Sequence, residues 1–257
     1  MKIIDVNMYN VDEVGVYCIK NKKSTGYRRK TDWFRQQLSN GLRMLIVVDQ
    51  QGKQLGFIEF VPSESAWRPV QAPNYYFIQC MVLFGKNVRN QRIGTTLLNS
   101  CEAEARSNNK SGICSVTSFG PWMANKTLFV KNGFESAGQL ERFELMFKPF
   151  HAQETPPRFI DWTKQRKNYA GWNLLFADQC PWHEKAISDI GKSAEANGIE
   201  LRITRITTPE EAQKAPSGFG TFSLIKDGKL LADHCISRTR FENIIRKENS
   251  NGGNSRG

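Results

Sequence analysis

The sequence predicts an α/β protein built from two successive units, and three observations carry that prediction. Strand-like and helix-like hydrophobic patterns alternate along residues 2–150. The alternation stops at 149–169, where a proline pair and a basic run give no clear periodicity. It resumes after position 170. We therefore expect one unit at 1–148, a linker or irregular arm at 149–169, a smaller unit at 170–248 and a disordered tail at 249–257.

The elements of the first unit follow from periodicity and from capping residues. The expected strands lie at 2–7, 43–49, 54–62, 75–84, 112–119 and 141–150, and the expected helices at 11–20, 31–40, 93–105 and 121–134. The helix at 31–40 would begin at Thr31 or Asp32 and end before Gly41, and the last helix would begin at Pro121. The segment 75–84 is apolar on both alternating faces, which is typical of a strand buried in the middle of a sheet.

The smaller unit shows the same kind of alternation. We expect strands at 172–178 and 199–206, a hairpin at 220–233, and helices at 181–198, 208–215 and 237–248.

Composition narrows the class of protein. Hydrophobic residues make up 39% and charged residues 24% of the chain, as in ordinary globular proteins. Neither a membrane-spanning run nor a secretory signal is visible, so we expect a cytoplasmic location and no membrane partner. The six cysteines are dispersed without metal spacing, which predicts neither a disulfide framework nor a metal site. The net charge of +11 suggests an anionic partner. Because the charge is scattered, we expect a phosphate-rich small molecule and no nucleic acid.

The stretch "VRNQRIGTTLLNS" at 88–100 is a candidate anion site. It follows the buried strand and leads directly into a helix, whose first N–H groups and dipole favour an anion. Gly94 would give the backbone conformational freedom and would let a phosphate approach closely, and Arg89 and Arg92 add positive charge. Any turn from a strand into a helix has some of these features, so the loop alone leaves both interpretations open.

The order of elements, this loop, and "LFVKNGFE" at 128–135 together resemble the GNAT acetyltransferase superfamily. The resemblance covers 1–148 and implies a mixed central sheet, acetyl-CoA as acyl donor and an amine as acceptor. It also implies that the loop binds the pyrophosphate of acetyl-CoA; the residues concerned are Arg89, Asn90, Gln91, Arg92, Ile93, Gly94 and Thr95. Arg92 departs from the family pattern, because it stands where a glycine is expected.

The same resemblance implies where the chemistry takes place. The central strand would separate from its neighbour near Val82, Leu83 and Phe84, whose backbone groups would bind the pantetheine arm. Phe129 occupies the position at which many members carry a tyrosine that protonates the CoA thiolate. Glu59 is our candidate general base, because its strand is apolar and burial would raise its pKa. An outward-facing carboxylate is the open alternative for Glu59.

Other polar and aromatic positions stay open on the sequence alone. Gln79 stands where some members carry an acidic residue, and an amide cannot act as a base. Trp67, Trp122 and Met123 could line the acceptor pocket, and the alternative for each is a place in the core.

The smaller unit resembles a thioredoxin-like domain. Cys180 lies between a strand and a helix, where the helix dipole would lower its pKa and make it reactive; a buried structural cysteine is the alternative. His183 replaces the second cysteine of a CxxC motif, and Gly220 stands where a cis-proline is expected. Without a resolving cysteine nearby in sequence, we expect a binding or dimerisation module, with a homodimer as one possible assembly. Cys235 could resolve a disulfide only if the fold brings it close to Cys180.

Both units together resemble the YoaP-like acetyltransferases. The leading hypothesis is an N-acetyltransferase that moves an acyl group from acetyl-CoA to an amine, with Glu59 and Cys180 as candidate catalytic residues. The alternatives are a non-catalytic CoA-binding sensor or scaffold, favoured by Phe129 and Arg92, and a thiol-active protein that uses Cys180.

Overall fold

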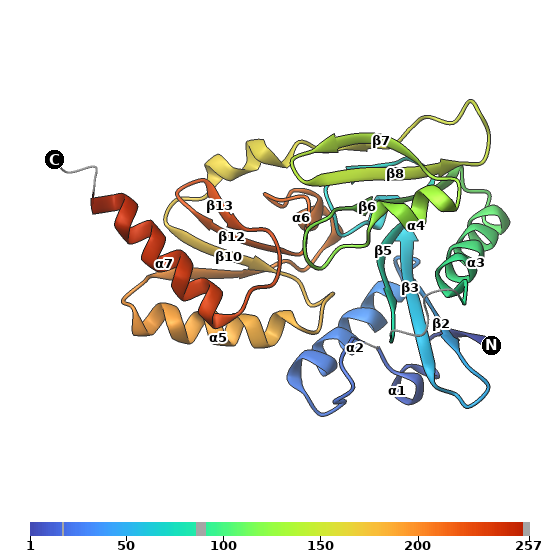
Figure 1. The fold of residues 1–257 in the computed structure, drawn as a ribbon, viewed down its shortest axis with the longest axis horizontal. Helices are drawn as coiled ribbons and strands as arrows, with labels where there is room; N and C mark the ends of the chain where they lie inside the picture. The colour runs from blue at the N-terminus through green and yellow to red at the C-terminus, as the bar shows by residue number, and fades with distance from the viewer. Residues whose placement is uncertain (17, 86–90, 254–257) are drawn as a thin grey trace.

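The computed structural model describes residues 1–16, 18–85 and 91–253, and two β-sheets organise them (Figure 1). The larger sheet has the strand order β1-β2-β3-β5-β6-β8-β7. Its strands are β1 (Lys2–Val6), β2 (Arg43–Val48), β3 (Gln54–Pro62), β5 (Tyr75–Leu83), β6 (Gly112–Thr117), β7 (Glu135–Leu140) and β8 (Phe143–Pro149). Only β5 and β6 pair in parallel, and all other neighbours are antiparallel. The expected mixed central sheet is confirmed.

Helices cover both faces of this sheet, as Figure 1 shows. They are α1 (Val11–Val14), α2 (Thr25–Leu38), α3 (Ile93–Ser107) and α4 (Lys126–Lys131). Successive residues of β2 point to opposite faces. Met44 therefore packs in the core that contains Phe34 of α2, and Leu45 packs in the core that contains Leu97 of α3. The predicted apolar face of α3 is buried throughout its length.

Two helices begin at residues other than those the sequence suggested. The N-cap of α2 is Ser24, whose Oγ accepts a hydrogen bond from the backbone N–H of Tyr27, so the helix starts six residues before Thr31. The N-cap of α4 is Asn125, and the expected start at Pro121 is wrong. Trp122 has a φ of 66°, which a right-handed helix does not allow.

The smaller sheet has the order β11-β10-β12-β13. Its elements are β10 (Trp172–Phe176), α5 (His183–Ala196), β11 (Leu201–Arg205), α6 (Pro209–Gln213), β12 (Phe222–Lys226), β13 (Lys229–Ala232) and α7 (Arg238–Gly253). β10 runs parallel to β11 and antiparallel to β12. α7 continues five residues beyond its expected end at 248, into the segment expected to be disordered. The thioredoxin-like assignment stays a prediction.

The linker is fixed to the first unit by its own short elements. β9 (Arg158–Phe159) pairs with β4 (Val70–Gln71), and two 3₁₀ segments flank this ribbon, η1 (Ser63–Ser65) and η3 (Trp162–Asn168). The Trp162 ring is fully buried against Phe143, and its Nε1–H donates to Glu141 at 2.8 Å.

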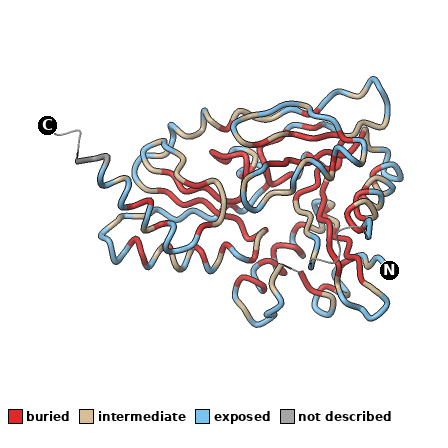
Figure 2. The backbone as a smooth tube through the Cα atoms, viewed as in Figure 1, coloured by how far each residue is buried: buried red, intermediate tan, exposed pale blue. Residues whose placement is uncertain are grey.

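The two sheets share their hydrophobic cores. One core joins Phe77 and Phe143 of the larger sheet to Leu174 and Phe222 of the smaller one. A second core joins Trp67 to Leu175 on the opposite face of β10. Buried backbone accordingly continues from one sheet into the other (Figure 2). No helix among the described residues has both the length and the apolar composition needed to cross a membrane.

Candidate active site

The two parallel strands of the larger sheet separate partway along their length. β5 and β6 pair from Tyr75↔Gly112 to Ile78↔Ser115, and beyond that point β5 pairs with β3 alone. Gln79 is an extra residue in the β3–β5 ladder, because Cys80 and Ile78 are the partners of successive β3 residues. The separation therefore begins at Gln79, three residues before the position expected from the sequence.

A cavity of about 390 Å³ occupies this opening. Ile78, Gln79, Cys80, Met81, Val82 and Phe84 line it from β5 and its end, and Ser115 and Val116 line it from β6. Leu83 is not part of the lining, since its side chain packs beside Gly56 and Gly94. The backbone N–H of Phe84 already donates to Leu55 O at 2.8 Å. This amide is therefore not free to bind the pantetheine arm, contrary to the expectation from the sequence.

A buried ion pair lies in the wall of the cavity. Glu59 on β3 is fully buried, its Oε2 accepts a hydrogen bond from Lys30 of α2, and its Oε1 accepts one from Gln179 Nε2 at 3.1 Å. The alternative of an outward-facing carboxylate is wrong, because Glu59 is buried and belongs to the lining of the cavity. Its role as a general base stays a prediction. The Lys30 ammonium also lies 4.0 Å from the centroid of the Trp33 ring. Sequence reasoning missed both Lys30 and Gln179.

The C-terminal part of the chain supplies one whole wall of the cavity. Gln179, Cys180, Pro181, Trp182, Phe219 and Thr221 line it from the smaller unit. Gly220 allows this close approach, because a Cβ there would lie 2.3 Å from the carbonyl oxygen of Trp67. The ring centroids of Trp122 and Trp182 are 6.5 Å apart, and both side chains are partly exposed. Of the three positions left open by the sequence, Trp122 and Met123 line the cavity, whereas Trp67 is a core residue.

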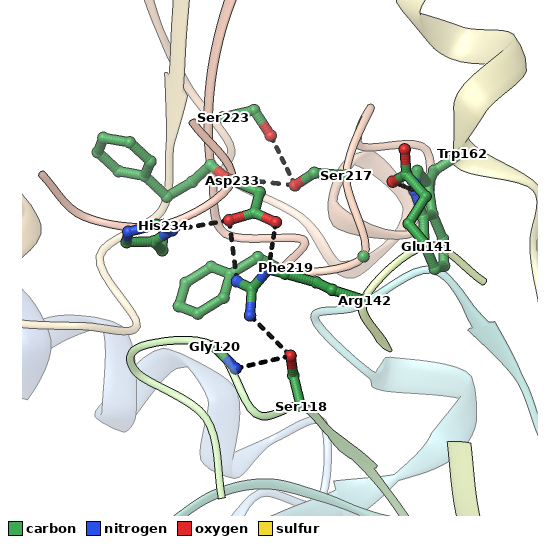
Figure 3. Close-up of polar contacts among 12 residues, drawn as sticks. Ser118, Gly120, Glu141, Arg142, Trp162, Ser217, Phe219, Ser223, Asp233 and His234 are labelled. Atoms are coloured by element: carbon green, nitrogen blue, oxygen red, sulfur yellow. Dashed lines mark hydrogen bonds and ion pairs between the residues drawn. The ribbon is translucent and has the colours of Figure 1, made fainter. Parts of the chain in front are cut away.

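An ion pair between the two units holds the loop that carries Trp122. Arg142 makes two hydrogen bonds to Asp233, of 2.6 and 2.8 Å, and a third of 2.9 Å to Ser118 Oγ, which accepts from Gly120 N–H (Figure 3). Burial would raise the pKa of Asp233, but hydrogen bonds from His234 and Arg142 outweigh it and hold that pKa at about 2. The Asp233 carboxylate is therefore ionised at neutral pH.

Cys180 does not have the electrostatic environment that the sequence suggested. Burial raises the pKa of its thiol to about 12, and the hydrogen bond from the backbone of Trp182 only partly offsets that effect. The expected lowering by the helix dipole is wrong, since α5 begins only at His183. Burial likewise raises the pKa of Cys235 to about 11, and its Sγ donates to Trp182 O at 3.7 Å. Both cysteines are free thiols.

The turn at the start of α3 is only partly described. Arg89 and Asn90 lie outside the described residues. Arg92 is the exposed N-cap, with a φ of 54°, a left-handed value that a glycine adopts without strain and an arginine does not. Gln91 is exposed and Thr95 is half-buried, while the side chain of Ile93 belongs to the core.

Gly94 serves packing in a way that the sequence did not suggest. Its φ is not in the left-handed range, so the expected need for conformational freedom is wrong. A Cβ there would lie 3.0 Å from the Leu128 side chain of α4. The missing side chain thus brings α3 close to α4, and binding of a pyrophosphate at this turn stays a prediction.

Comparisons with known proteins agree with this architecture. Residues 11–134 match the model of the Acetyltransferase (GNAT) family, and residues 200–243 match the YoaP-like model. The chain therefore contains a GNAT acetyltransferase domain, and these similarities support an acetyl-CoA-dependent N-acetyltransferase. It also has a YoaP-like region in its C-terminal part, and it is 26% identical over 251 residues to the uncharacterized N-acetyltransferase YoaP of Bacillus subtilis, covering 95% of this chain and 98% of that one.

Solved structures of acetyltransferases were also found. Ribosomal-protein-alanine N-acetyltransferase of Brucella melitensis is 18% identical with a TM-score of 0.41, covering 62% of this chain and 100% of that one. A GNAT-family acetyltransferase of Staphylococcus aureus MU50 is 16% identical with a TM-score of 0.39, covering 58% of this chain and 99% of that one.

Proposed function

We propose that acyl transfer takes place in the cavity between β5 and β6, on an amine held between the acetyltransferase domain and the C-terminal wall. The observation that carries the proposal is the separation of β5 from β6, which opens a cavity beside a buried carboxylate. Backbone groups on the free edge of β5 could hold the pantetheine arm, and the start of α3 favours its phosphates. The acceptor would then enter between Trp122 and Trp182.

Glu59 is the proposed general base. It takes a proton from the amine nitrogen as that nitrogen bonds to the thioester carbonyl carbon. The carbon–sulfur bond then breaks, and CoA leaves as its thiolate. Phe129 lines the cavity and has no proton to give, so the thiolate leaves unprotonated; with a reference thiol pKa of about 8.5 this is a moderate penalty. Lys30 balances the charge of Glu59, and Gln179 fixes its orientation.

Release of CoA thiol from acetyl-CoA, measured with the full chain and a panel of amines, tests the proposed function. Glu59→Gln should lower kcat/KM by about 100-fold or more, as for the loss of a general base. Glu195→Gln is the matched control, because Glu195 is exposed on α5. Equal turnover by the two variants would refute the role of Glu59.

Binding without turnover is the alternative outcome of the same assay. Tight binding of acetyl-CoA with no turnover on any amine would favour a CoA-binding scaffold. A role for Cys180 in thiol chemistry is not favoured, because its pKa is raised. The expected homodimer stays a prediction, which the mass in solution would test.

A further inference from the structure

Arg68 is a buried cation that faces the cavity and pairs with no carboxylate among the described residues. It lies between η1 and β4, is 6% exposed and lines the cavity wall. Its Nη1 donates to the carbonyl oxygens of Gly218 at 3.3 Å and Phe219 at 2.8 Å, and its guanidinium lies 4.7 Å from the centroid of the Phe219 ring. These contacts use one of its three nitrogens. Burial lowers the pKa of Arg68 only to about 10, so the guanidinium is charged at neutral pH.

The acidic groups near Arg68 are already engaged. Asp233 forms two hydrogen bonds with Arg142, and Glu59 is paired with Lys30. Of the described residues that line the cavity, only Lys30, Glu59 and Arg68 are of the charged types, and Lys30 and Glu59 pair with each other. The cavity therefore has an excess of one positive charge. An unpaired buried charge is costly, and a monoanionic ligand would remove that cost.

A second donor without a partner among the described residues belongs to the lining of the same cavity. Gln79 is 5% exposed, and its Oε1 accepts a hydrogen bond of 2.8 Å from the backbone N–H of Trp67, the residue before Arg68. Its Nε2 is buried with no hydrogen-bond partner among the described residues, and Gln79 also lines the cavity. The Arg68 guanidinium and the Gln79 amide each have N–H groups that are not used by the described residues, and such groups fit the two oxygens of a carboxylate.

We propose that Arg68 and Gln79 bind a carboxylate of the acceptor, so that the acceptor is a small amine that carries a carboxylate, such as an amino acid. This inference rests on the proposed function of the cavity. A carboxylate matches the single excess charge, whereas a phosphate dianion would overcompensate it. The volume of about 390 Å³ must also hold the end of the acyl donor, which favours an acceptor of amino-acid size over a long peptide.

The first test compares amino acids with the corresponding amino-acid amides in the CoA-release assay. The amides keep the amine and the side chain and lose only the negative charge. We expect kcat/KM to be about 100-fold higher for the acids, because the amides would leave Arg68 unpaired. Equal turnover of acids and amides, or turnover only of amines without a carboxylate, would overturn the inference while leaving the proposed function standing.

The second test uses variants of Arg68. Arg68→Met should raise KM for the acids far more than it lowers kcat, and it should remove the preference for acids over amides. Arg68→Lys should restore part of that preference, because lysine keeps the positive charge. Arg202→Met is the control, because Arg202 is exposed on β11. An unchanged preference in Arg68→Met would contradict the inference. Should that variant not fold, the acid–amide comparison on the unaltered chain and Arg68→Lys still decide.

A binding measurement separates this inference from the proposed function. N-acetyl amino acids, the products of the proposed reaction, should bind the full chain in calorimetry, and Arg68→Met should weaken that binding about tenfold or more. If these products bind through Arg68 but no amine is acetylated, the proposed function fails and the carboxylate site stands. If amines are acetylated but the affinity for these products is the same in Arg68→Met, the carboxylate site fails.

Discussion

The neutral, buried His183 beneath the C-terminal wall should make the stability of the protein depend on pH. The side chain is 1% exposed, lies against Phe222, and shares a 2.8 Å hydrogen bond between its Nδ1 and Ala177 O. Its Nε2 is buried without a partner among the described residues. Burial lowers the pKa of His183 from 6.5 to about 4. A proton at Nε2 would thus place a positive charge in the protein interior, where no described group compensates it.

The direction of the pH dependence follows from the two pKa values of His183, 6.5 in the unfolded chain and about 4 in the folded chain. Above about pH 6.5 neither the folded nor the unfolded state binds this proton. Between 6.5 and about 4 the unfolded chain takes it up and the folded chain does not, so the free energy of unfolding falls as the pH falls. At 1.36 kcal/mol per pKa unit, the loss from about pH 7.5 to about pH 5 is about 2 kcal/mol.

Urea unfolding at these two pH values measures the effect. His183→Asn keeps an N–H donor and cannot titrate, so the variant should lose about 2 kcal/mol less than the unaltered chain over this interval. His151→Asn is the control, because His151 is exposed. Each protein is compared with itself at the two pH values, which removes the packing cost of the substitution. An equal loss in the unaltered chain and in His183→Asn would refute the reasoning.

Three further predictions concern packing, reactivity and backbone strain. Gly220→Ala should lower the free energy of unfolding by about 2 kcal/mol or more, because its Cβ would meet the backbone of Trp67. Gly198→Ala, which has a similar φ but open space around it, should lower the free energy of unfolding by about 1 kcal/mol. Equal losses in the two variants would contradict the predicted clash with Trp67. Cys180 should be alkylated by iodoacetamide more slowly in the folded chain than in urea at about pH 8, because its raised thiol pKa leaves little thiolate, and equally rapid labelling, followed by mass spectrometry, would contradict the raised pKa. Arg92→Gly should raise the free energy of unfolding by about 1 kcal/mol through relief of its left-handed φ, and a loss in urea unfolding would speak against that strain.

The sequence was sufficient for the parts of the fold that local patterns determine. The apolar run of β5 and the buried face of α3 are visible as periodicity, because burial imposes the same spacing wherever an element lies. The start of α2 is not visible as periodicity, because Gly26 and the basic residues 28–30 conceal an early turn. The signal was present, since Ser24 is a capping residue and Lys30 lies three positions from Tyr27 and four from Phe34, on the buried face of the helix.

The chemistry of the site depends on contacts that no local pattern encodes. Lys30 and Glu59 are 29 residues apart, and Arg68 lies 151 residues from Phe219. The first contact depends on how α2 packs on the larger sheet, and the second on how the C-terminal unit packs against the acetyltransferase domain. Hydrophobic periodicity specifies neither arrangement. For the same reason the sequence could place Cys180 near the start of a helix but could not show that burial, which raises its pKa, would dominate.

Hydrogen exchange of the full chain, with and without acetyl-CoA, tests most directly the central claim that the donor binds where β5 leaves β6. On this account acetyl-CoA slows exchange about tenfold or more in peptides that cover 79–85 and 91–97, because β5 has a free edge there and α3 begins there. The peptide that covers β11 at 201–205, in the smaller sheet, should not change. Unchanged exchange at 79–85, with protection confined to other segments, would contradict the account.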